Sequence, residues 1–136
     1  MTKPFSFGRK EKLKSRKAIK ELFAIGSSLS IFPLRVSYRF SPAVSNEPSN
    51  IQVGVTVSSR QFKRAVDRNR IKRLLRECYR LQKQELLWVM EQRGLRGLLF
   101  FIYVDKKMPD YNELYLTVGK SLQVLLKHLP ANEKRN

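Results

Sequence analysis

A long amphipathic segment from about Arg64 to Arg93 constrains this chain more than any other feature of its sequence. Its apolar residues recur with the period of an α-helix, and Gly94 and Gly97 predict its end. At about 100° per residue, one face gathers apolar side chains, namely Ile71, Leu74, Leu75, Cys78 and Val89. The opposite face carries Asn69, Arg70, Lys72, Arg73, Arg76, Arg80 and Lys83. Such a helix has to bury one face against another layer and present its basic face outward.

The basic face of this segment has almost no acidic residues to balance it. Between Arg60 and Lys83, ten basic residues stand against Asp67 and Glu77, and the whole chain has a formal net charge of +17. A solvated helix face is the ordinary interpretation, but uncompensated like charges destabilise a helix. The charge therefore predicts a polyanionic partner, nucleic acid or an anionic membrane. The many arginines favour nucleic acid over a membrane, because the planar guanidinium group can bind a phosphate with two hydrogen bonds.

The remaining composition argues against a membrane or secreted protein. The longest apolar run, Leu98 to Val104, has seven residues, whereas a spanning helix needs about 20. Residues 1–20 hold eight basic residues but no apolar run of a signal peptide follows them. Cys78 is the only cysteine, so no internal disulfide forms and a cytoplasmic protein is expected. The length predicts one domain, 1–136, with a flexible basic arm at 1–10 and a flexible tail at 131–136, and the charge predicts that this domain binds nucleic acid.

A short helix is expected near the N-terminus. Ser15 can cap it, and Ile19, Leu22 and Phe23 share one face. Gly26 is a plausible end. This helix would place an apolar stripe against the rest of the domain.

Strands and a final helix complete the pattern. Alternation predicts strands at 34–40, after Pro33, and at 51–57, where Gly54 can admit a close neighbour. Residues 98–104 have the composition of a buried strand, and 41–50 has that of a loop. Asp110 and Glu113 form a capping pattern before a helix that carries Leu114, Val118, Leu122, Leu125, Leu126 and Leu129. The order of helix, strands, helix, strand and helix predicts one α+β layered domain.

No arrangement of residues predicts a protein active site. His128 is more plausible as a capping or surface residue than as a catalyst, and Cys78 more plausible as a core thiol than as a nucleophile. The carboxylates of Asp105 and Asp110 form no metal-ligand pattern. Phe23 and Tyr38 are the aromatic residues to test for stacking on bases. We therefore expect no catalytic residue and no metal site on the protein.

The string from Ala65 to Glu77, Ala-Val-Asp-Arg-Asn-Arg-Ile-Lys-Arg-Leu-Leu-Arg-Glu, resembles the signature of the bacterial ribonuclease P protein family. The strand residues Val53 to Ser58 and the opening segment that includes Phe23 to Gly26 are also similar to that family. The resemblance spans roughly residues 9–129. It implies a single-domain α–β sandwich with a mixed sheet of about four strands and three helices, in the order αβββαβα. It also implies a left-handed crossover through the Arg-rich helix.

The resemblance further implies a function in a ribonucleoprotein endoribonuclease. The protein subunit would bind the catalytic RNA and the 5′ leader of precursor tRNA, while the RNA and its Mg²⁺ remove the leader. The resemblance implies that the RNA subunit is bound by Lys63, Arg64, Arg68, Asn69, Arg70, Lys72, Arg73, Arg76 and Arg80. Residues implied for the leader are Phe23, Arg35, Ser37, Arg39 and Arg60. No obligate protein partner is expected.

The chain departs from the family pattern near the leader residues. Ser59 and Arg60 stand where the family usually has two lysines, and Ile19 stands where an aromatic residue is common.

Two other interpretations of the function remain open from the composition of the chain. One is a structural RNA-binding protein of the ribosomal type. The other is a stand-alone nuclease or a DNA-binding factor. The sequence shows no catalytic cluster for a nuclease and no helix-turn-helix pair for a DNA-binding factor.

Overall fold

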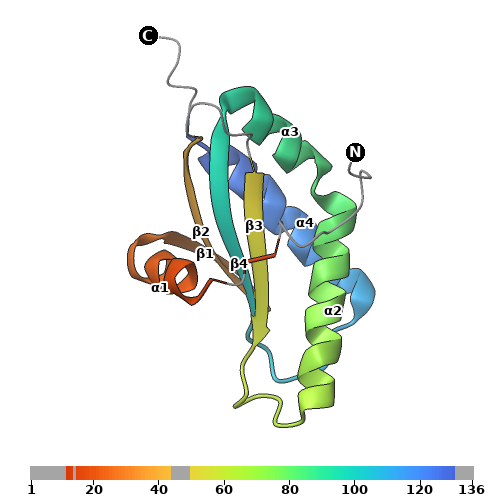
Figure 1. Ribbon diagram of the computed structural model, residues 1–136. Helices are drawn as coiled ribbons and strands as arrows, with labels where there is room; N and C mark the ends of the chain where they lie inside the picture. Colours follow the sequence, from red (N-terminus) through yellow and green to blue (C-terminus); the bar gives the residue numbers. More distant parts are fainter. Residues whose placement is uncertain (1–11, 14, 44–49, 131–136) are drawn as a thin grey trace.

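The computed structural model describes residues 12–13, 15–43 and 50–130, and its centre is a mixed sheet with helices on both faces (Figure 1). The strands are β1 (Ser27–Ile31), β2 (Leu34–Pro42), β3 (Asn50–Val57) and β4 (Leu95–Tyr103). The helices are α1 (Arg16–Ile25), α2 (Ala65–Gln82), α3 (Gln84–Arg93) and α4 (Tyr111–His128). The predicted arm at 1–10 and tail at 131–136 lie outside the described residues, as do positions 44–49 of the predicted loop.

Within the described residues, the sheet has four strands in the order β1-β2-β4-β3. β1 pairs with β2 and β2 pairs with β4 in the antiparallel sense, whereas β3 and β4 are parallel. A parallel pair requires a crossover connection, and here the chain passes through α2 and α3 between the two strands. The α+β class, the mixed four-stranded sheet and the crossover through the Arg-rich helix are thus confirmed. The left-handed sense of that crossover stays a prediction.

β4 is covered on both faces, which explains its continuous apolar composition. Leu99 and Phe101 belong to the main core under α2, α3 and α4. Phe100 belongs to a smaller cluster under α1, together with Leu22. A Cβ at Gly54 would lie 2.3 Å from Cε1 of Phe100, so the close neighbour expected at this glycine is confirmed.

The helix caps predicted by the sequence are also confirmed. The Ser15 hydroxyl accepts a hydrogen bond of 3.2 Å from the backbone N–H of Ala18, and α1 ends at Gly26. The Asp110 carboxylate accepts a hydrogen bond of 3.1 Å from the backbone N–H of Glu113 at the start of α4. Within the described ranges, no helix combines the length and apolarity needed to cross a bilayer.

The prediction of one continuous helix from 64 to 93 is wrong. The helix is interrupted at Lys83, and Figure 1 shows α3 leaving α2 at an angle, so the described residues form four helices rather than three. The side-chain amide of Gln82 donates to the carbonyl of Cys78 at 3.1 Å and to that of Tyr115 in α4 at 2.9 Å. These bonds tie the end of α2 to α4. Gly94 ends α3 in the left-handed region, with φ 64°, as expected.

The strands differ from the pattern-based boundaries, and β2 and β3 extend into the predicted loop 41–50, as far as Pro42 and from Asn50. β1 was not located by alternation, because Ser27–Ile31 contains three serines; it forms by pairing with the edge of β2. β4 begins at Leu95 and includes Gly97, which was expected near a helix end. A Cβ at Gly97 would lie 2.8 Å from the ring of Phe40, so this glycine permits close packing inside the sheet.

Candidate RNA interfaces on the two faces of the sheet

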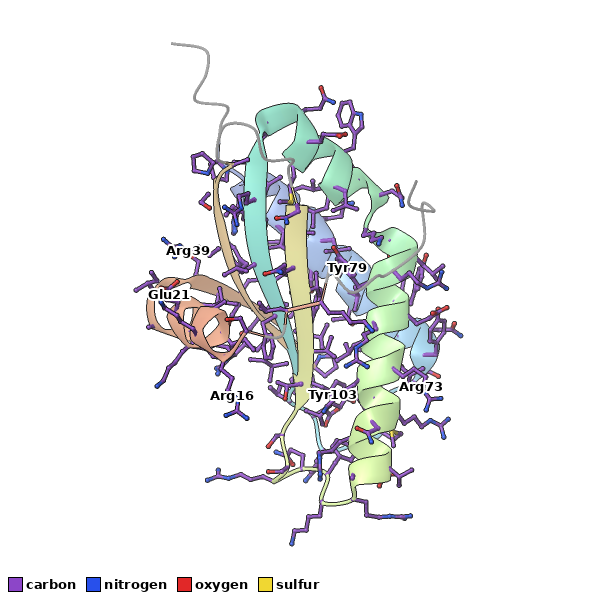
Figure 2. All side chains as sticks on the ribbon, in the orientation of Figure 1. Arg16, Glu21, Arg39, Arg73, Tyr79 and Tyr103 are labelled. Carbon is purple, nitrogen blue, oxygen red and sulfur yellow. The ribbon has the colours of Figure 1, made fainter. Side chains whose placement is uncertain are left out.

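The outer face of α2 presents a basic surface. Ile71, Leu75 and Cys78 are fully buried against the sheet and α4, which fixes the orientation of the helix. Figure 2 shows Arg73 on the side of α2 that points away from the sheet. The predicted residues that are exposed here and in the loop before α2 are Lys63, Arg64, Asn69, Arg70, Arg73 and Arg76. The structure therefore brings these six together as one surface.

Arg68 stabilises the start of this surface. Its guanidinium Nη1 donates to the backbone carbonyls of Phe62 at 2.7 Å and Lys63 at 2.8 Å. Arg64, the residue before the first turn of α2, makes no side-chain capping bond. The Arg68 side chain thus ties the incoming loop to the helix, and part of its hydrogen-bonding capacity is used within the protein.

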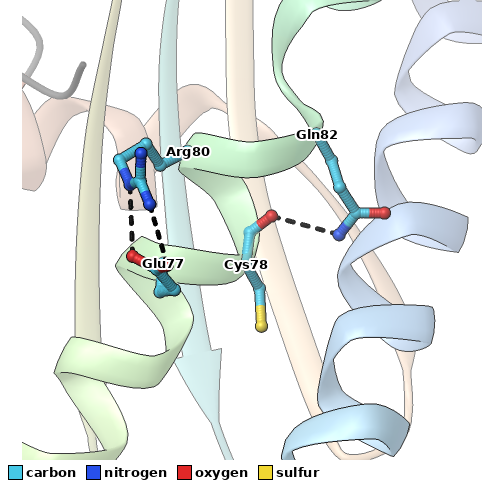
Figure 3. Close-up of polar contacts among 4 residues, drawn as sticks. All are labelled: Glu77, Cys78, Arg80 and Gln82. Atoms are coloured by element: carbon cyan, nitrogen blue, oxygen red, sulfur yellow. Dashed lines mark hydrogen bonds and ion pairs between the residues drawn. The ribbon is translucent and has the colours of Figure 1, made fainter. Parts of the chain in front are cut away.

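Arg80 is also engaged within the protein (Figure 3). Its Nε and Nη2 donate to the two carboxylate oxygens of Glu77 at 3.1 and 2.8 Å. The hydrogen bond from Arg80 lowers the pKa of the Glu77 carboxyl, so this group stays ionised. The pair neutralises one positive charge near the end of α2. Together with the half-buried Lys72, Arg80 and Arg68 are the predicted residues least available to a partner.

The opposite face of the sheet has hollows beside α1. One hollow of about 260 Å³ is lined by Phe23, Arg35 and Ser37, together with Leu22, Gly26, Ser27, Ser28 and Ile102. Three of the five residues predicted for the leader thus lie together. Phe23 is 50% exposed and its ring meets Phe100 edge-on, with centroids 5.3 Å apart. The hollow therefore combines an aromatic wall, a hydroxyl and a guanidinium.

The other two predicted leader residues lie elsewhere. Arg39 lines a second hollow of about 360 Å³, where its Nη1 lies 3.9 Å from Oε1 of Glu21. Arg60 lies in the loop between β3 and α2, close in sequence to the basic residues before α2. The predicted set is therefore distributed over three places. Sequence patterns did not single out Glu21, Gln52 or Arg96, which also line the second hollow.

A third hollow joins the two faces. It has about 300 Å³ and is lined by Lys12, Ile19 and Arg76, together with Leu13, Val53, Gly54, Val55 and Phe100. Leu13 reaches this place because its backbone N–H donates to the carbonyl of Val53 at 2.9 Å, along the edge of β3. Arg76 of α2 thus borders the α1 side of the sheet, so the basic face of α2 and the face that carries α1 meet at this edge.

The other candidate residues have structural roles. The expectation that Tyr38 could stack on a base is wrong, because it is only 8% exposed and its hydroxyl lies 2.9 Å from Nδ1 of His128. Cys78 is a core thiol, as predicted, and burial raises its pKa to about 11. In the part of the chain that the structure describes, no three His, Cys, Asp or Glu side chains could hold a metal ion together.

The arrangement of helices and strands matches solved structures of one class of RNA-processing proteins. The ribonuclease P protein of Thermotoga maritima superposes with a TM-score of 0.59 at 23% identity, over 89% of this chain and 99% of that chain. A mutant ribonuclease P protein of Staphylococcus aureus gives a TM-score of 0.62 at 18% identity, over 87% and 90%. At these identities the likeness defines the fold, which is that of the ribonuclease P proteins.

Sequence comparison identifies the family. The family model for ribonuclease P matches residues 7–129. The ribonuclease P protein component of Porphyromonas gingivalis is 34% identical over an alignment of 138 positions, covering 100% of this chain and 99% of the relative. That of Chlorobaculum tepidum is 42% identical over 100 aligned residues, covering 70% and 65%. The chain therefore belongs to the ribonuclease P protein family.

Proposed function

We propose that this chain is the protein subunit of a ribonuclease P, which removes the 5′ leader of precursor tRNA. The observation that carries the proposal is the exposed basic face of α2, which displays Asn69, Arg70 and Arg73 from the family's Arg-Asn-Arg-Ile-Lys-Arg string. Arg70 and Arg73 are exposed and do not belong to the buried residues of α2, so they can contact phosphates without disturbing the core. We assign this face to the catalytic RNA.

We assign the face that carries α1 to the leader of precursor tRNA. Phe23 supplies an aromatic ring, Ser37 a hydroxyl, and Arg35 a cation within one hollow. A single-stranded RNA needs such a combination, because its bases stack on aromatic rings while its phosphates attract guanidinium groups. Arg39 extends the same face beyond α1, whereas Arg60 would contact RNA from the loop before α2.

Chemistry in this scheme belongs to the RNA subunit. RNA-bound Mg²⁺ would activate the water that attacks the phosphodiester, and the protein would hold RNA and substrate together. We expect one RNA-binding domain that works in the cytoplasm, where precursor tRNA is made, without an obligate protein partner. A structural protein of the ribosomal type would also carry a high positive charge. That function does not explain why α2 contains the Arg-Asn-Arg-Ile-Lys-Arg string of the ribonuclease P family.

Reconstitution tests the proposal. The chain, freed of RNA, is mixed with precursor tRNA in Mg²⁺, with and without the RNA subunit from the same organism. We expect cleavage only in the presence of the RNA subunit, with a mature 5′-monophosphate end. Cleavage by protein shown to be free of RNA would refute the assignment of chemistry to the RNA. A chain that neither binds nor assists the RNA subunit would refute the proposed function.

A further inference from the structure

The second hollow beside α1 is lined mainly by polar and charged side chains. Its volume of about 360 Å³ lies within the range of small-molecule pockets, roughly 300–1,000 Å³. The register of the sheet sets two rows of side chains in its floor. Arg39, Leu98 and Gln52 form one row across β2, β4 and β3, and Ser41, Arg96 and Asn50 form the next. The floor is therefore apolar at Leu98 and polar on both sides of it.

An acidic side chain at this place is unusual in so basic a chain. Glu21 projects from α1, and its carboxylate lies 3.9 Å from the guanidinium of Arg39, with both side chains about half exposed. Figure 2 shows the two residues side by side at α1, on the opposite side of the sheet from Arg73. An exposed pair at this distance is weak, so RNA can replace it at little cost. A carboxylate repels phosphate but accepts hydrogen bonds from base N–H groups.

We propose that this hollow holds one nucleotide of the leader and that Glu21, beside Arg39, selects guanine there; the inference rests on the proposed function. The Watson–Crick edge of guanine presents the O6 acceptor followed by the N1–H and N2–H donors. Arg39 donates to O6, while the two carboxylate oxygens of Glu21 accept from N1–H and N2–H. Adenine, cytosine and uracil each lack such a pair of adjacent donors. Leu98 contacts the base, and the amide of Gln52 lies at the far side of the floor.

The experiment uses the reconstituted holoenzyme and a set of precursor tRNAs. Each leader position in turn carries guanine, adenine, cytosine or uracil, and binding is measured at one fixed salt concentration. We expect one leader position at which guanine binds about fivefold more tightly than the other bases. Inosine at that position should bind less tightly than guanine, because inosine lacks the N2 amino group. A precursor without a leader should show no such ranking.

Substitution of Glu21 decides whether this side chain makes the selection. Glu21→Gln and Glu21→Ala should abolish the preference for guanine while the circular dichroism spectrum stays unchanged. Glu91→Gln is the matched control, because it removes one exposed acidic charge from α3 without touching the hollow. This control should retain the preference.

The outcomes separate this inference from the proposed function. If leaders with different bases bind equally although the leader itself adds affinity, the selection of guanine is refuted and the proposed function stands. If Glu21→Gln raises the affinity of all leaders by one common factor and keeps their ranking, Glu21 only tempers the charge of Arg39 and the inference is wrong. If precursors with and without a leader bind equally, the leader assignment fails and this inference fails with it.

Discussion

Replacing Arg70 and Arg73 together by alanine should weaken binding to the RNA subunit and reduce its salt dependence. Of the residues assigned to the RNA subunit, five exposed cations lie on α2 and the loop before it, namely Lys63, Arg64, Arg70, Arg73 and Arg76. If each neutralises one phosphate, the slope of log K against log salt is about −3.5 to −4.5, since one phosphate contributes about 0.7–0.9. Removing two of them should lower the slope by about 1.4–1.8. At about 1 kcal/mol per contact, the affinity should fall about thirtyfold.

The matched control is Arg35→Ala with Arg39→Ala, which changes the charge equally on the other face. This control should leave binding to the RNA subunit unchanged and weaken binding of precursor tRNA only when the leader is present. Both pairs of side chains are exposed, so thermal unfolding should be the same as in the parent chain. The assay is equilibrium binding of each variant to the RNA subunit over a series of salt concentrations. Equal slopes and equal losses for both pairs would show that the charge acts as one undivided field.

Three further predictions concern the structure that supports these faces. Gly54→Ala sets a Cβ 2.3 Å from the ring of Phe100; we expect a loss of about 1–3 kcal/mol in urea unfolding, and weaker leader binding. Cys78 should resist alkylation at pH 8 until the chain unfolds, and stability should decline between pH 9 and 11 because burial raises the pKa of the folded thiol from 9.0 to about 11. Asp110→Ala removes the cap on Glu113 and should cost about 1 kcal/mol in thermal unfolding.

Features set by short-range patterns could be predicted from the sequence. The apolar face of α2 follows from residues three and four apart, and the strands β2 and β3 follow from strict alternation. The caps at Ser15 and Asp110 depend on side chains that bond within their own first turn. Each of these features is determined within a few residues of chain, so no knowledge of the tertiary structure was needed.

The break at Lys83 depends on contacts that no local pattern contains. The apolar periodicity continues through it to Leu86 and Met90, which are both buried in α3. The end of α2 is instead held by the amide of Gln82, whose second acceptor is the carbonyl of Tyr115 in α4. β1 is a similar case, because a serine-rich segment becomes a strand only where β2 offers an unpaired edge.

The engagement of individual arginines also could not be predicted. A helical wheel shows the arginines of α2 only as basic residues and does not show which of them make hydrogen bonds within the protein. In the structure, Arg68 donates to loop carbonyls and Arg80 pairs with Glu77. The separation of Arg35 from Arg39 likewise depends on where α1 lies across the sheet. Their alternation in β2 predicts one common face, but it does not reveal that a helix stands between them.

The dimensions of α1 explain why hollows form on both sides of it. β2 has nine residues, which span about 30 Å at about 3.3 Å per residue, whereas a helix with its side chains is about 10–12 Å wide. α1 rests on the apolar centre of this face, where Leu22 packs with Phe100, and it leaves both ends of the strands uncovered. Arg35 lies in the hollow at one end and Arg39 in the hollow at the other. A single-stranded RNA that contacts both arginines therefore has to pass over or around α1.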